Sequence, residues 1–424
     1  MKTVSKFRVL QNFSDSVSTG TNPAHSLGSD FKFVWWIESI PVKVIRRGNI
    51  MNAFPRFLST AFLASVSLYS PLSPIADAVA QSCGRWAISE IPSIGGDETR
   101  AVSVNNRNQV VGYGYDASDM LRGFIYENGG TTLLDPAYGS HSVAVGINYY
   151  GVVAANSGEI MLADPSEMFD QFYLSSHAST FDATHGMVDV HESGDPISIA
   201  MGLNDKGQVV GHTKLSPDSG SLPFSYHPET GMVQLPMVPG CVQGGAVGIN
   251  NQFTALGMCF AFTANGPESH AYTYNPQSGV TDLGDFGSFY IWPSSISDSG
   301  TVVGFTIDYA PTAYHGFIYD QSGGMRAFPA EGRNAGVRPV DINKYGDVIG
   351  QSDVEGAFLY QRGMMLKLND LVDPASEWQI LRATAINDQR TIVGVGTHKG
   401  NVRGFVMMPL KTKLLCSNLI ASIY

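Results

Sequence analysis

A phrase of about twelve residues recurs seven times along the chain, and this recurrence restricts the fold more than any other feature of the sequence. The best-preserved copy, Ala200 to Gly211, is a small residue, an aliphatic residue, Asn204, a polar turn, two valines and a glycine. The position of Asn204 is held in successive copies by Asn105, Asn148, Asn204, Asn250, Ser297, Asn343 and Asn387. The steps between copies are 43, 56, 46, 47, 46 and 44 residues. Such a period is typical of a repeat architecture.

Residues at fixed offsets from this asparagine position share a chemical type. The residue four positions earlier is always alanine or proline, and the residue one position earlier is always aliphatic. Seven positions later the residue is glycine in six of the seven copies: Gly112, Ala155, Gly211, Gly257, Gly304, Gly350 and Gly394. We interpret the phrase as a β-hairpin, because Asn bonds its own backbone two residues on and Gly supplies positive φ in the turn. The later glycine indicates a bulge or the close approach of a neighbouring sheet.

An aromatic strand follows six of the seven hairpins about ten to twenty residues later. It is seen at Gly123 to Tyr126, Pro223 to Tyr226, Ala271 to Tyr274, Gly316 to Tyr319, Ala357 to Tyr360 and Gly404 to Met407. A glycine-containing turn then leads to a fourth strand, such as Gly231 to Leu235 or Val280 to Gly284. Four short strands in a unit of about 45 residues match the blade of a β-propeller.

With these two elements the chain resembles the extracellular HAF repeat proteins, whose units combine an Ile-Asn-x-x-Gly-x-Val-Val-Gly turn with a His-Ala-Phe-like strand. The second element is closest at His270-Ala271-Tyr272, with His315-Gly316-Phe317 and Arg403-Gly404-Phe405 as variants. The resemblance extends over residues 85 to 409. It implies an extracellular location and a repeat fold, and it implies no particular activity.

The two ends of the repeat region complement each other. The segment Trp86 to Pro92 matches a fourth strand, and Arg403 to Pro409 matches a third strand. We therefore expect an all-β, seven-bladed β-propeller in residues 81–410, closed by antiparallel pairing of these two segments. A six-bladed ring is the alternative if the second unit, which has Ala155 for glycine and about ten extra residues, forms no blade.

The amino-terminal region has the pattern of an export signal. Arg56 precedes the apolar run Phe57 to Tyr69, and small residues lead to a cleavage site after Ala80. This assigns residues 51–80 to a secretory signal peptide and residues 411–424 to a tail, with Met51 as the start and residues 1–50 as a leader of uncertain reality. The apolar run is too short for a membrane span of about 20 residues. We expect a secreted or periplasmic monomer without a transmembrane segment.

Cysteine and charge agree with export. An even number of cysteines in an exported chain favours disulfides. Ring closure would bring Cys83 near Cys416, while Cys241 and Cys259 lie nine residues either side of Asn250 on one hairpin; four free thiols are the alternative. Residues 81–424 hold 18 basic and 33 acidic side chains. Such a surface repels nucleic acid and favours cation binding.

Catalytic signatures are scarce. The sequence contains no Gly-x-Ser-x-Gly elbow, His-Glu-x-x-His motif, P-loop or Asp-x-Asp-x-Asp-Gly calcium loop. One candidate site remains in the second unit, where His185, Asp189 and His191 would share one face of an extended strand and could bind a divalent cation or exchange protons. The alternative is a solvated loop face.

We therefore expect a binding scaffold that takes a protein, a glycan or a cell-surface component through loops on one face, with no cofactor. The competing hypothesis is an extracellular hydrolase or lyase with its active site in the non-repeated loops of the second unit.

Overall fold

The computed structural model describes residues 86–410 apart from 166–170, 192–196, 215–219, 265, 289, 310–311 and 330–335. Its secondary structure is almost entirely antiparallel β-sheet, with a short helix α2 (Leu368–Leu371) and a 3-10 turn η1 (Pro374–Ser376) between two strands. In this part of the chain no helix is long and apolar enough to cross a membrane. The proposed leader, the signal peptide and the cysteines Cys83 and Cys416 lie outside the described residues.

Four of the sheets contain four consecutive strands each, in meander order. They are β2 (Gly95–Val104), β3 (Val110–Asp116), β4 (Leu121–Glu127) and β5 (Gly130–Leu134); β14 (Cys241–Ile249), β15 (Ala255–Thr263), β16 (Gly266–Asn275) and β17 (Gly279–Gly284); β18 (Tyr290–Ile296), β19 (Val302–Tyr309), β20 (Thr312–Asp320) and β21 (Gly324–Ala327); and β22 (Val337–Ile342), β23 (Val348–Ser352), β24 (Gly356–Gln361) and β25 (Met364–Lys367).

An eight-stranded sheet contains the second and third repeat units. Its strands are β6 (His141–Ile147), β7 (Val153–Leu162), β8 (Gln171–Asp182), β9 (Gly186–Asp189), β10 (Ile197–Leu203), β11 (Val209–Lys214), β12 (Ser221–His227) and β13 (Gly231–Gln234). Within it β6–β9 and β10–β13 form separate antiparallel meanders, joined by a parallel pairing of Ile197 with Ser176. The irregular second unit thus forms four paired strands like the others.

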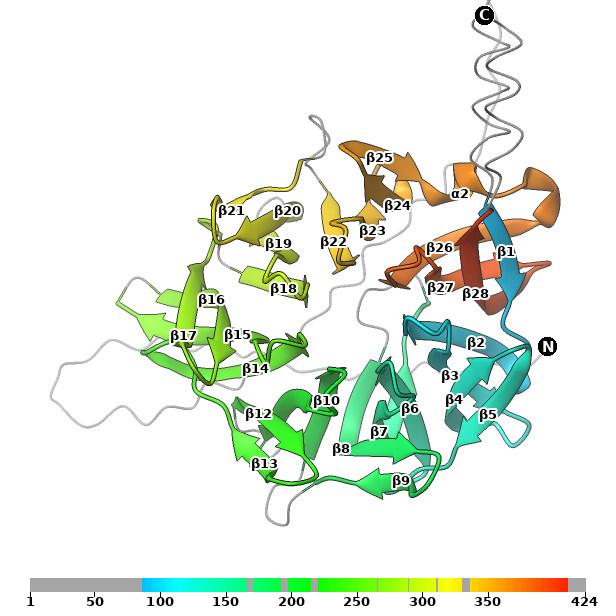
Figure 1. The fold of residues 1–424 in the computed structure, drawn as a ribbon, viewed down its shortest axis with the longest axis horizontal. Helices are drawn as coiled ribbons and strands as arrows, with labels where there is room; N and C mark the ends of the chain where they lie inside the picture. Colours follow the sequence, from blue (N-terminus) through cyan, green and yellow to red (C-terminus); the bar gives the residue numbers. More distant parts are fainter. Residues whose placement is uncertain are drawn as a thin grey trace, which may run out of the picture. The chain divides into compact units, whose positions relative to one another are not determined.

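The last sheet combines the two ends of the described chain. Strand β1 (Trp86–Glu90) pairs antiparallel with β28 (Asn401–Pro409), beside β27 (Ile392–His398) and β26 (Trp378–Ile386). Trp86 lies opposite Pro409 and Glu90 opposite Phe405. This confirms the predicted pairing of the first and last segments. In Figure 1 the sheets follow one another around a common centre in sequence order.

The glycine seven positions after the asparagine is explained by an aromatic ring of its own sheet. Gly304 pairs with Phe317 of the third strand. A Cβ on Gly304 would lie 2.6 Å from Cζ of Phe317 and 2.4 Å from the carbonyl oxygen of Trp292, so the site has no room for a side chain. The same relation between glycine and ring occurs in the pairs Gly112–Phe124, Gly211–Phe224, Gly257–Tyr272, Gly350–Phe358 and Gly394–Phe405.

The expected bulge is present, and the expected neighbouring sheet is not the cause of the glycine. In every unit the first strand shifts register directly after the small residue that pairs with this position, as between Ala200 and Gly202. The second unit carries a matched exchange, because Ala155 lies opposite Ser179 instead of a ring. Removing the ring leaves room for the alanine Cβ.

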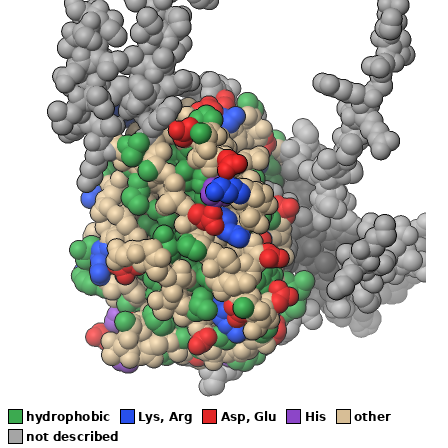
Figure 2. Space-filling model, turned by 90° about the vertical axis from the view of Figure 1, so that its right-hand side faces the viewer, with side chains coloured by type: hydrophobic (Ala, Val, Ile, Leu, Met, Phe, Trp, Pro, Cys, Tyr) green, Lys and Arg blue, Asp and Glu red, His purple; other side chains and the backbone are tan. Residues whose placement is uncertain are grey.

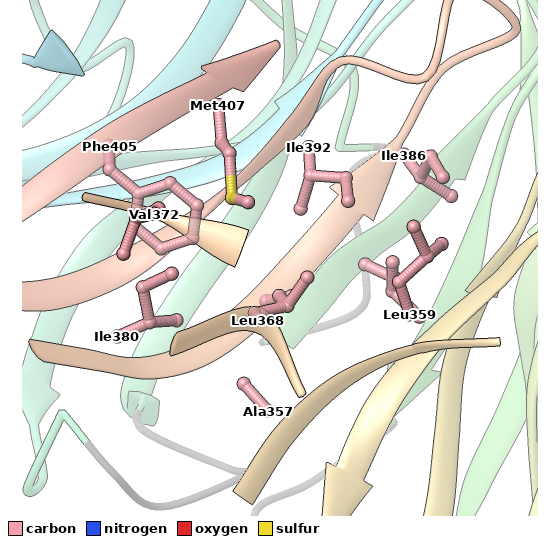
Figure 3. Packing of buried hydrophobic residues seen from close by; sticks show 11 residues of the cluster. Ala357, Leu359, Leu368, Val372, Ile380, Ile386, Ile392, Phe405 and Met407 are labelled. Atoms are coloured by element: carbon pink, nitrogen blue, oxygen red, sulfur yellow. The ribbon is translucent and has the colours of Figure 1, made fainter. Parts of the chain in front are cut away.

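The hydrophobic core lies between successive sheets. Figure 3 shows one such layer, in which Ala357 and Leu359 of β24 pack with Ile380 and Ile392 of the sheet formed by β1 and β26–β28. Leu368 of α2 belongs to the same cluster. All are nearly or fully buried. Burying such a side chain contributes about 1.5–3 kcal/mol, so these layers hold neighbouring sheets together.

Candidate functional site

Strand order separates the connections into two faces. In each meander the turns after the first and third strands lie at one end, which we call the turn face, and the connections after the second and fourth strands lie at the other, which we call the loop face. The turn after the first strand has the same length in all seven units, whereas the loop-face connections differ in length and include α2 and η1. Variable connections on a rigid scaffold are the usual location of binding residues.

The turn face is tied together by the repeated asparagines. Asn204 Oδ1 accepts hydrogen bonds from the backbone N–H of Lys206 and Gln208, both at 3.0 Å, which fixes its own turn. Its Nδ2 donates to the carbonyl oxygen of Asn250 in the next unit at 3.1 Å. The corresponding bonds between units run from Asn105 to Asn148, Asn148 to Asn204, Asn250 to Ser297, Asn343 to Asn387 and Asn387 to Asn105. The asparagine position therefore links units as well as forming turns.

Ser297 interrupts this series, since a serine has no amide nitrogen to donate. Beside the interruption a partly buried carboxylate of the sixth unit, that of Asp341, connects to the fifth and the seventh units. Asp341 accepts from Ser295 Oγ at 2.7 Å and from the backbone N–H of Ile386 at 2.9 Å. Burial raises the pKa of Asp341 to about 6, against the effect of these hydrogen bonds, which favour the ionised form.

On the loop face, histidines pair with carboxylates. His177 Nδ1 lies 2.7 Å from Asp189 Oδ2, and His270 Nδ1 lies 3.1 Å from Asp282 Oδ2. Each carboxylate lies at or near the end of a fourth strand, where the chain passes to the loop face. In the sheet formed by β1 and β26–β28, Arg403 Nε donates to Glu90 at 3.1 Å. As in the two histidine pairs, the carboxylate lies opposite the residue two positions after its partner. The first residue of the His-Ala-Phe-like element thus joins the third strand to the fourth at His270 and Arg403, whereas Nε2 of His315 lies 3.0 Å from Asp308 of the second strand.

A stacked-ring cluster lies where the second unit meets the third, and it is composed of Tyr138, His177, Asp189, His191 and Ser198. The Tyr138 and His177 rings stack with centroids 3.6 Å apart, and the His177 and His191 rings with centroids 3.8 Å apart. Ser198 Oγ lies 2.8 Å from Nδ1 of His191.

The cluster combines flat rings with an acid–base pair. The exposed part of the Tyr138 ring, beside this pair, can contact a flat or hydroxyl-bearing ligand. The sequence analysis did not predict the His177–Asp189 pair. The signal that could have revealed it is the spacing of twelve residues, which His270 and Asp282 share.

The structure separates the three residues predicted to bind a metal. His185 lies in the turn before β9, its side chain is 70% exposed, and its Nδ1 lies 2.8 Å from Asp182. Asp189 ends β9 and His191 follows it, both in the stacked-ring cluster. The prediction required one extended strand through all three residues, but the strand spans only part of the segment. No group of three His, Cys, Asp or Glu side chains within the described ranges could hold a metal ion.

Cys241 and Cys259 form a disulfide across the β14–β15 hairpin, with their Cα atoms 5.8 Å apart. Two exposed hydrophobic side chains, Val242 and Phe262, lie close to it along these strands. Figure 2 shows acidic, basic and hydrophobic side chains interspersed over the side of the molecule that it displays.

Comparison with known proteins gives fold-level likenesses only. No protein-family model and no curated protein matches the chain. Among solved structures it is similar to an acylaminoacyl peptidase of Pyrococcus horikoshii (TM-score 0.46, 9% identity, 76% of this chain and 54% of that one). It is also similar to a puromycin-hydrolyzing peptidase of Mycobacterium tuberculosis, with a TM-score of 0.45 and 14% identity over 83% of this chain and 55% of that one. A third similar structure is TolB of Acinetobacter baumannii, with a TM-score of 0.39 and 11% identity over 82% of this chain and 71% of that one. The chain spans about half the length of the two peptidases.

Proposed function

We propose that residues 81–410 form a single seven-bladed β-propeller of the HAF repeat kind, exported by the signal at residues 51–80. Three observations support this: the seven equivalent hairpins, the four strands of the second unit, and the pairing of β1 with β28. The hydrogen bond from Asn387 to Asn105 then joins the seventh unit to the first. The disulfide at Cys241 and Cys259 is consistent with a location outside the cytoplasm.

The protein acts, in this proposal, as a monomeric non-enzymatic scaffold that binds a protein, a glycan or a cell-surface component on its loop face. The observation that carries this is the stacked-ring cluster, which places aromatic surface and a histidine–carboxylate pair beside connections of variable length. Rings of this kind contribute stacking energy to many ligands, and the hydrogen-bonding groups around them supply specificity.

The test is ligand capture from envelope extracts with the exported protein as bait. The variant Tyr138→Ala/His177→Ala should lose the captured ligand, while a turn-face variant such as Lys206→Ala should retain it. Equal capture by the wild type and the double variant would overturn the loop-face assignment. Recovery of the protein only from the cytoplasm would overturn the export assignment.

A second candidate is a hydrolase or lyase centre in the second unit. The His177–Asp189 pair favours it, because a carboxylate that orients an imidazole is a common general acid–base arrangement. Turnover of a polysaccharide or peptide panel, lost in His177→Gln and in Asp189→Asn, would support the enzyme. Absence of turnover with intact ligand capture leaves the scaffold.

A further inference from the structure

Exposed aromatic side chains occupy the turn face, opposite the stacked-ring cluster. They are Tyr149, Tyr150, Phe253 and Tyr345, with exposed fractions of 47%, 70%, 42% and 59%. All four lie in the turns that follow the asparagine position, in the second, fourth and sixth units. Because these rings are largely exposed to water, they contribute little hydrophobic stabilisation to the fold. The stability of the fold therefore does not explain why aromatic residues stand here.

Phe253 is held in a conformation that a bulky side chain rarely adopts. Its φ is +61°, and the equivalent residue in four other units is a glycine. A left-handed conformation costs a non-glycine residue about 1–2 kcal/mol. Asn108 and Arg390 share the conformation but form hydrogen bonds through their side chains, to Thr391 and Asp347. A phenyl ring has no polar atom to form such a bond. Backbone strain that no stabilising contact offsets is typical of functional sites.

The Tyr149–Tyr150 pair is fixed in place by its turn. Asn148 Oδ1 accepts from the backbone N–H of Tyr150 at 3.0 Å, and Asp205 accepts from the N–H of Tyr149 at 2.7 Å. The two tyrosine rings meet edge to face with centroids 5.5 Å apart. These rings therefore need little ordering on binding, which lowers the entropic cost of association.

Polar oxygen and nitrogen atoms lie between the rings. Asn251, two residues before Phe253, donates through Nδ2 to Asp205 at 3.0 Å and to Asp298 at 3.1 Å. Carboxylate and amide groups thus connect the tyrosine turn with the phenylalanine turn and continue into the next unit. They interrupt the apolar surface, so the rings do not form the contiguous patch typical of a hydrophobic protein interface or a membrane contact.

We propose that the turn face binds a neutral polysaccharide, with Phe253 and the Tyr149–Tyr150 pair as stacking platforms. The flat C–H faces of pyranose rings suit isolated exposed aromatic rings, and sugar hydroxyls suit the oxygens of Asp205 and Asp298. These carboxylates disfavour an anionic chain such as nucleic acid or an acidic polysaccharide. The site lies on the face opposite the proposed scaffold site and does not depend on it.

The test measures binding of soluble neutral polysaccharides of several linkages to the full exported chain, by affinity electrophoresis and calorimetry, with alginate as the anionic probe. Phe253→Gly removes the ring at a position where glycine is favoured, so its melting temperature should equal or exceed that of the wild type. Its affinity, and that of Tyr150→Ala, should fall about tenfold or more. Phe262→Ala is the matched control, because it removes a phenyl ring that is 57% exposed at a loop-facing strand end, and it should bind like the wild type.

Any of four results would overturn the proposal. The first three are no binding to any neutral polysaccharide, wild-type affinity in Phe253→Gly, and a loss in Phe262→Ala as large as that in Phe253→Gly. The fourth is tighter binding to alginate than to every neutral chain. Capture of an envelope ligand through Tyr138 and His177 is measured separately, so failure of either site leaves the other assignment standing.

Discussion

Nδ2 of Asn387 donates a 2.9 Å hydrogen bond to the carbonyl oxygen of Asn105, residues 282 positions apart in the chain. The asparagines between them form five further bonds of the same kind, each to the carbonyl at the equivalent position of the next unit. All six donors are at least 95% buried. Because a buried hydrogen bond contributes about 0.5–1.5 kcal/mol and a buried unpaired group costs more, this network should contribute strongly to holding successive units together.

Asn250→Asp should lower the free energy of unfolding by about 1–3 kcal/mol. The aspartate keeps the oxygen that accepts from Gln252 and Thr254, but it replaces the amide donor with a carboxylate oxygen that faces the carbonyl of Ser297. Chemical denaturation of the purified protein measures the change. Gln252→Glu, the same amide-to-carboxylate change at an exposed position of this turn, is the control. Equal stability of Asn250→Asp and the wild type would show that the inter-unit bond contributes nothing.

Ser297→Asn should stabilise the protein by about 0.5–1.5 kcal/mol. Six units donate an amide hydrogen to the next turn, and the serine of the fifth unit is too short and lacks the group. The amide of an asparagine at this position would donate to the carbonyl oxygen of Asn343, as the asparagines of the other units donate to the next turn. The melting temperature reports the gain, and Ser299→Asn in the same turn is the matched control. A decrease in the melting temperature of Ser297→Asn would contradict the geometry.

Gly304→Ala should destabilise the protein by about 2 kcal/mol or more. The added Cβ would lie 2.6 Å from the ring of Phe317 and 2.4 Å from a backbone oxygen, so the ring and the strand must move. Gly248→Ala provides the comparison, because its nearest neighbour, Cγ2 of Ile296, would be 4.0 Å from the new Cβ. Denaturation curves for both variants test the difference, and similar losses would argue against the ring as the cause.

Stability should decrease as pH rises through the titration of Asp341. Its pKa is near 6 in the folded protein, above the ordinary value of 3.8, so the folded state binds this proton more tightly than the unfolded state. The associated stability is present below about pH 4 and is lost as pH rises to 6. The loss is at most about 3 kcal/mol, since one pKa unit corresponds to about 1.4 kcal/mol.

Asp341→Asn removes this titration, so the difference in unfolding free energy between the wild type and the variant should change between pH 4 and 7. Denaturant titrations across that range measure the change. Asp353→Asn, whose side chain is exposed, is the control and should leave the pH dependence unaltered. A constant difference between the wild type and Asp341→Asn would show that the carboxyl titrates normally.

The sequence by itself determined the features that depend on local chemistry. The hairpin at each asparagine followed from its bond to the backbone two residues on, as at Asn204, to which the structure adds a bond four residues on. The pairing of β1 with β28 followed from matching strand patterns at the two ends. Repetition strengthened both predictions, since seven copies share one geometry.

Only the tertiary structure decided which distant groups meet. It assigned the glycine at Gly304 to the ring of Phe317 rather than to a neighbouring sheet, and it separated His185 from His191 by ending β9 between them. It also revealed that each asparagine amide donates to the next unit. These contacts join residues on different strands or in different units, and their distances depend on register and sheet packing, which a list of residue types along the chain does not contain.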